Sequence, residues 1–74
     1  MNRLANRAYR LYVTIEKDQR KNVSQTAFPL SQVGQHEAEE AYAKLQKEPA
    51  VVELKLFRHD ETGLKLLKRF ERGK

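Results

Sequence analysis

Residues 51–71 read VVELKLFRHDETGLKLLKRFE, and they predict a β-hairpin. Asp60 and Gly63 stand at the first and fourth positions of the DETG segment. A type I turn followed by a glycine bulge favours those residue types at those positions. Apolar and polar residues alternate on both sides of the turn, as in half-buried strands. A helix over residues 64–71 is the competing interpretation, because the apolar residues there also fit a helical repeat.

The position of the bulge predicts which residues of the hairpin face each other. A bulge at the turn sets Asp60 opposite Leu64 and Phe57 opposite Leu67. One face of the hairpin then carries the residues expected in the core, which are Val52, Leu54, Leu56, Leu64, Leu66 and Phe70. A register shifted by one residue would scatter this apolar set over both faces, so burial favours the bulged register.

The N-terminal third predicts a second pair of strands. From Ala8 the sequence alternates strictly, with Tyr9, Leu11, Val13 and Ile15 on one side. Residues 17–22 are all polar and predict a loose hairpin connection. Residues 23–28 predict a short, weak strand that ends before Pro29, since proline cannot donate to a β-ladder.

Residues 31–48 change to a helical period. The apolar stripe at i, i+3, i+4 and i+7 consists of Ala38, Ala41, Tyr42 and Leu45. Two starts of the helix are possible. Ser31 is a good N-cap residue, but a start at Ser31 places Gly34 in the first turn, where glycine is unfavourable. Gly34 is itself the second candidate cap. With Gly34 as the cap, Glu37, Glu39 and Glu40 lie near the positive end of the helix dipole. Pro49 predicts that the helix ends near Lys47.

These elements predict a single α+β domain over residues 1–74, with a loose arm at residues 1–7. The expected architecture is a two-layer sandwich, in which an antiparallel sheet of three or four strands carries one helix on one face, in the order β-β-α-β-β. The helix stripe is expected to cover Leu11, Val13, Ile15, Leu54, Leu56, Leu66 and Phe70.

The composition bounds the class of protein. A chain of 74 residues with 39% hydrophobic and 34% charged residues is long enough for one small folded domain. It contains no cysteine, which removes disulfides and thiolate metal sites and favours a reducing compartment such as the cytoplasm. No apolar run approaches the roughly 18 residues of a membrane helix or the shorter core of a signal peptide, so neither is expected.

The residue types needed for catalysis are sparse. His36 and His59 are not part of any nucleophile pattern, and His36 with Glu40 supplies only two potential metal ligands. The three glycines are too far apart for a phosphate-binding loop. The sequence therefore predicts no enzyme, metal, cofactor or small-molecule substrate.

Charge is divided unevenly along a chain whose formal net charge is +5. Residues 1–30 carry a net +4 and residues 51–74 a net +3, whereas the helical segment 31–50 carries −2. The sheet face turned away from the helix is expected to combine cations with aromatic and apolar residues. The candidate binding residues on it are Arg10, Tyr12, Lys55, Phe57, Lys65, Leu67 and Arg69.

This face supports two functional hypotheses. The first is a protein-interaction or dimerising module, because Phe57 opposite Leu67 leaves an apolar pair that a protein partner or a second copy can cover. The alternative is a sequence-tolerant nucleic-acid-binding module. Lysines and arginines would then contact phosphates, while Tyr12 and Phe57 stack on bases.

The sequence resembles known proteins in two respects. The segment Leu11–Glu16 is similar to the first short motif of RNA-recognition motif domains, which would give Tyr12 a base-stacking role. The second motif of that family and a helix directly after the first strand are missing, so no family is assigned. In size the chain resembles accessory proteins that phages and plasmids encode to bind or inhibit host proteins, or to bind nucleic acid.

Overall fold

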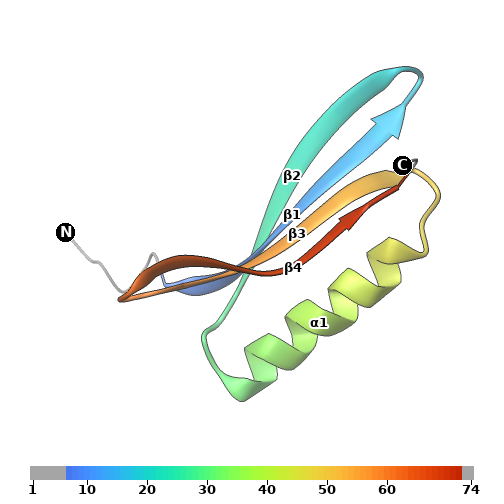
Figure 1. Cartoon of the computed structure of the whole chain (residues 1–74). Coiled ribbons are helices and arrows are strands. Elements are labelled where there is room, and N and C mark those ends of the chain that lie inside the picture. The colour runs from blue at the N-terminus through green and yellow to red at the C-terminus, as the bar shows by residue number, and fades with distance from the viewer. Residues whose placement is uncertain (1–6, 73–74) are drawn as a thin grey trace.

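A four-stranded antiparallel sheet and one helix form the computed structural model, which describes residues 7–72 (Figure 1). The elements in chain order are β1 (Ala8–Lys17), β2 (Arg20–Phe28), α1 (Gln32–Gln46), β3 (Val51–Asp60) and β4 (Gly63–Glu71). The strands lie in the order β2-β1-β3-β4. The predicted α+β architecture and the β-β-α-β-β order are confirmed. Of the predicted arm at residues 1–7, all but Arg7 lies outside the described residues.

The first hairpin is tighter than the sequence predicts. Lys17 pairs with Arg20, so Asp18 and Gln19 form the whole turn. Both have positive φ, 54° and 66°, as a two-residue hairpin turn of the primed type requires. The predicted loose connection over residues 17–22 is therefore wrong. β2 begins earlier than expected, and it is an edge strand with exposed polar residues that give little hydrophobic signal.

The helix begins at the first of the two candidate caps. The Ser31 side-chain oxygen accepts a hydrogen bond from the Gly34 N–H at 3.0 Å. The alternative cap at Gly34 is wrong, and the first turn contains no acidic residue. Gly34 is instead buried in that turn, where its backbone lies directly against Pro29. The helix ends as predicted, with Lys47 at the C-cap.

The hairpin of β3 and β4 is confirmed, and its helical alternative is excluded. Its bulge, however, lies in the middle of β4 and not at the turn. Asp60 pairs directly with Gly63 and Phe57 with Leu66, whereas Leu56 already pairs with Lys68. Leu67 is therefore the extra residue. The shift turns Leu64 and Leu66 away from α1, so the prediction that they lie in the core is wrong.

The core lies between α1 and the three strands β2, β1 and β3. Its buried residues are Tyr9, Leu11, Val13, Ala38, Tyr42, Val51, Leu54 and Leu56. Phe70 and Ile15 pack at the border of this cluster. Val51 takes the place predicted for Val52, because a second irregularity of the ladder pairs Ile15 with Val51.

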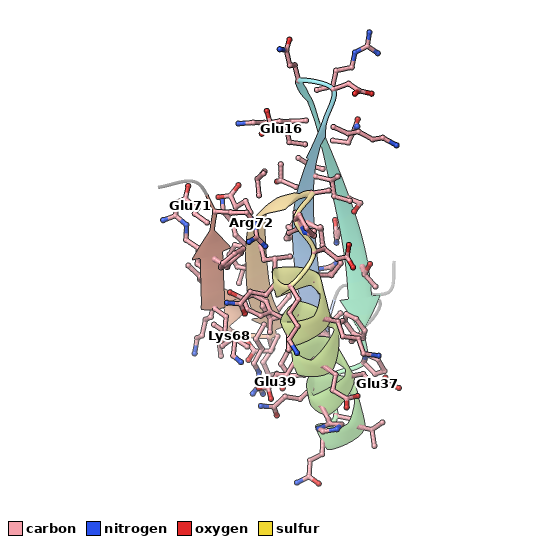
Figure 2. The ribbon with its side chains drawn as sticks, turned by 90° about the vertical axis from the view of Figure 1, so that its right-hand side faces the viewer. Glu16, Glu37, Glu39, Lys68, Glu71 and Arg72 are labelled. Carbon is pink, nitrogen blue, oxygen red and sulfur yellow. The ribbon has the colours of Figure 1, made fainter. Side chains whose placement is uncertain are left out.

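Arg72 connects the end of the sheet to the end of the helix. Its Nε donates to the Val51 carbonyl at 2.8 Å, and its Nη2 donates to the carbonyls of Gln46 at 2.6 Å and Glu48 at 3.1 Å. Figure 2 shows Arg72 next to the segment that follows α1. A cation at this position also complements the negative end of the helix dipole.

Asp60 gives the β3–β4 turn a dependence on pH. Its Oδ1 accepts hydrogen bonds from the hydroxyl and the backbone N–H of Thr62, and these bonds lower the pKa of Asp60. A lowered pKa stabilises the fold above the ordinary aspartate range, and this contribution is lost as the pH falls through the folded-state value. We expect Asp60→Asn to lower the urea midpoint at neutral pH, and to lower it less at about pH 2.5, because the contribution shrinks as the carboxylate is protonated. An equal difference at both pH values would contradict this role of the carboxylate.

Candidate interaction surface

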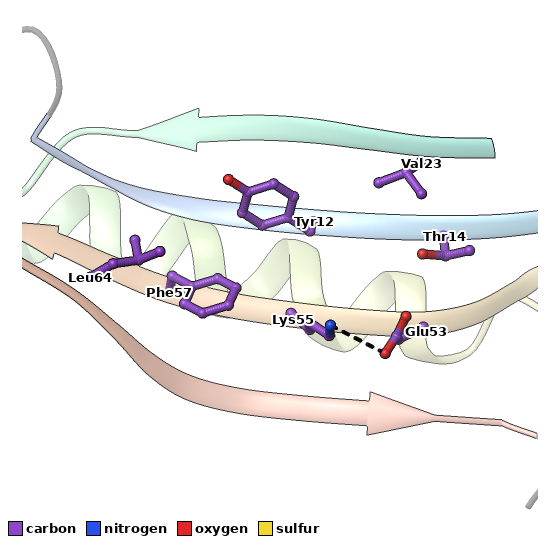
Figure 3. Close-up of a pocket in the computed structure, with 7 residues that line it drawn as sticks. All are labelled: Tyr12, Thr14, Val23, Glu53, Lys55, Phe57 and Leu64. Atoms are coloured by element: carbon purple, nitrogen blue, oxygen red, sulfur yellow. Dashed lines mark ion pairs between the residues drawn. The ribbon is translucent and has the colours of Figure 1, made fainter.

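The sheet has one face covered by α1 and one open face, which we call the outer face. The strand register assigns to it Arg10, Tyr12, Thr14, Glu16, Lys21, Val23, Gln25, Ala27, Glu53, Lys55, Phe57, His59, Leu64, Leu66, Arg69 and Glu71. Figure 3 looks onto this face, with α1 behind the sheet. Alternation along each strand places these side chains on one side.

An aromatic pair occupies the middle of the outer face. The rings of Tyr12 and Phe57 meet edge to face, with centroids 5.5 Å apart and planes at 87°. They border a shallow hollow of about 320 Å³, which is lined by Tyr12, Thr14, Val23, Glu53, Lys55, Phe57 and Leu64 (Figure 3). The hollow is open and has no buried polar side chain without a hydrogen-bond partner among the described residues. Four of its seven lining residues, Tyr12, Val23, Phe57 and Leu64, are aromatic or aliphatic, so the hollow presents a largely apolar contact surface.

Exposed leucines extend this surface to the edge of the sheet. On β4, Leu64, Leu66 and Leu67 are 53%, 51% and 46% exposed. β4 is an edge strand beside β3, and almost all of its residues are exposed. Contiguous exposed apolar residues of this kind are typical of interaction sites.

Three of the four cations of the outer face have neighbours of complementary chemistry. Lys55 lies 3.6 Å from Glu53, and Arg69 lies 2.9 Å from Glu71 and 3.9 Å from Glu53. Arg10 donates from Nε to the His59 Nδ1 at 3.3 Å. The face as a whole carries four cations and three carboxylates. It is therefore close to neutral, although the whole chain carries a net +5.

The structure brings together five of the seven predicted site residues. Arg10, Tyr12, Lys55, Phe57 and Arg69 lie side by side on the outer face. Lys65 pairs with Arg58 on the side that carries α1, so its predicted place is wrong. Leu67 is the bulged residue, and Leu66 takes its predicted place opposite Phe57.

Sequence reasoning missed Leu64, Leu66 and Val23 as members of this surface. Leu66 and Leu67 are consecutive, whereas a regular half-buried strand has only one apolar residue in every two. This break in the alternation was the available signal for a bulge in the middle of the strand.

A second group of cations lies beside α1 on the covered face. The Lys68 Nζ is 5.5 Å from the centre of the Tyr42 ring, and the Arg58 Cζ is 6.0 Å from that of Tyr9. Arg58 also pairs with Asp60 at 3.1 Å. These side chains cover the border of the core, and such contacts between cations and aromatic rings are stabilising.

Within residues 7–72, no group of three or more histidine, aspartate or glutamate side chains is placed to hold a metal ion. His36 and Glu40 lie 3.4 Å apart on the exposed side of α1. No helix in this part of the chain is long and apolar enough to span a membrane.

Comparisons with known proteins give no relative: no family model matches the chain, and neither does any curated protein or solved structure.

Proposed function

We propose that this protein is a non-catalytic protein-interaction module that binds its partner through the outer face. The observation that carries this proposal is the exposed apolar strip of Leu64 and Leu66 beside Phe57 and Tyr12, which no other part of the described chain covers. Aromatic rings are effective anchors in interfaces, since they bury a large area and lose few torsional degrees of freedom.

The charges of the outer face favour a protein partner over a nucleic acid. Lys55 and Arg69 are in ion pairs, and Lys65 lies on the other side of the sheet. A polyanion would have to displace the carboxylates of Glu53 and Glu71 before the cations could contact phosphates. A protein surface can instead bury the apolar strip and leave these ion pairs at the polar rim of the interface.

A module of this kind acts by occupying a surface. It fits an accessory protein or an inhibitor, of the type that phages and plasmids encode, and a chain without cysteine suits the reducing cytoplasm.

Photo-crosslinking inside the cells that produce the protein tests this proposal. Benzoylphenylalanine placed at Leu66 points to the proposed partner, and the same group at Lys65 is the matched control on the opposite side of the strand. We expect a protein adduct from position 66, none from position 65, and loss of the adduct when Phe57→Ala is added. An adduct with RNA or DNA, or none at position 66, would reject the proposal.

A further inference from the structure

We infer that the occupant of the outer face is a second copy of this chain, packed face to face about a two-fold axis that runs parallel to the strands. This inference rests on the proposed function and names its partner. It places β1 of one protomer over β3 of the other, and β2 over β4, as in an aligned sandwich of two sheets.

Electrostatics allow self-association through this face. Two copies that each carry a net +5 repel each other at long range. The outer face is the part of the sheet where this repulsion is smallest, with four cations against three carboxylates. The β4 side chains on the α1 side of the sheet are less suited to self-association, since Lys65 and Lys68 both lie there.

The strand register selects the direction of the axis. Three rows cross the middle of the outer face: Arg10 with Phe57 and Leu66, then Tyr12 with Lys55 and Arg69, then Thr14 with Glu53 and Glu71. A further row, His59 with Leu64, lies at the end next to the β3–β4 turn. A two-fold axis perpendicular to the strands and centred on one of these three rows brings like charges together. On the first row it opposes two arginines, on the second two pairs of cations, and on the third two pairs of carboxylates.

The same perpendicular axis can also be centred between two rows. Centred between the last two rows, it places Phe57 at the start of the partner's β3, where the sheet ends. Centred between the first two rows, it opposes no like charges, but it places Leu66 over the partner's Arg69 and Leu64 over the partner's Glu71, so the exposed leucines would be buried against charged side chains.

An axis parallel to the strands opposes no like charges. It places Arg10 over the partner's Phe57 and Tyr12 over the partner's Lys55, so each of these cations meets an aromatic ring. By symmetry each contact occurs twice. Thr14 then lies over the partner's Glu53, and Ala27 lies over the partner's Leu66.

The available area predicts a weak dimer. Four strands about 4.8 Å apart and about nine residues long make a face of about 19 by 30 Å. Two such faces bury about 1,100 Å², which is just below the roughly 1,200 Å² at which specific, stable interfaces begin. We therefore expect a dissociation constant in the micromolar range or weaker, with rapid exchange.

Sedimentation equilibrium of the full chain tests the inference. We expect a monomer–dimer equilibrium that Leu66→Glu weakens at least about tenfold. Val33→Glu is the matched control, since Val33 on α1 is even more exposed than Leu66 and the charge change is the same. It should leave the equilibrium within about threefold of wild type. Raising sodium chloride from about 50 to about 500 mM should strengthen the dimer, since salt screens the net repulsion. A monomer at all concentrations, or equal weakening by both variants, would overturn the inference.

A cross-linking experiment tests the axis. The chain has no cysteine, so Thr14→Cys in one preparation and Glu53→Cys in another are unique sites. A short bis-maleimide should join the mixed preparations more than either alone, and preferential joining of either variant to itself would reject this axis. The proposed function and the dimer can be rejected independently. If position 66 crosslinks to a different protein in cells while the purified chain is monomeric, the dimer is rejected and the proposed function stands.

Discussion

Replacing Gly34 by alanine is expected to destabilise the protein by about 1–3 kcal/mol, although alanine is the better helix former. A Cβ at this position would overlap the backbone carbonyl of Pro29. The carbonyl belongs to the main chain and cannot move without displacing the connection between β2 and α1. The expected measurement is a lower urea midpoint, followed by circular dichroism.

Ala43→Gly is the control for this variant, because Ala43 is exposed on α1. It should cost about 1 kcal/mol from helix propensity alone. If Gly34→Ala instead stabilised the protein by a similar amount, the close contact between the helix and Pro29 would be refuted.

Replacing Leu54 by alanine is expected to have the largest effect, about 2–5 kcal/mol. Leu54 is completely buried, in the core cluster under α1. A domain of this size has only a few kcal/mol of stability, so most of this variant should be unfolded at 25 °C. Circular dichroism and tyrosine fluorescence measure the folded fraction.

Leu66→Ala is the matched control, because the chemical change is the same and Leu66 is half exposed on the outer face. We expect a cost within about 0.5 kcal/mol for the isolated protomer, measured below the dimer's dissociation constant. Equal losses in both variants would mean that Leu66 is in the core and that the bulge lies at the turn.

The sequence predicted those parts of the fold that depend on local spacing. The alternation in β1, the helical stripe that includes Ala38 and Tyr42, and the turn signal at Asp60 and Gly63 each specify an element with little help from the rest of the chain. The fold class followed from the order of these elements.

The missed features depend on contacts between distant residues. Gly34 reads as unfavourable in a helix, and only the proximity of Pro29 explains it. The bulge at Leu67 depends on how β4 fits both the turn and the pairing of Leu54 with Phe70. The true position of the bulge shifts the register of the first half of β4 by one residue, so Lys65 and Leu66 lie on the opposite faces from those predicted. This is why the candidate surface was predicted only in part.

The central claim is that the outer face of the sheet is the surface through which this chain binds a second copy of itself. A dilution series of the isotope-labelled protein, followed by NMR chemical shifts, tests it most directly. We expect concentration-dependent shifts at Tyr12, Phe57, Leu64 and Leu66, with constant shifts at Lys65 and Val33. Shifts confined to the lysines of β4 beside α1, or to α1 itself, would contradict the account.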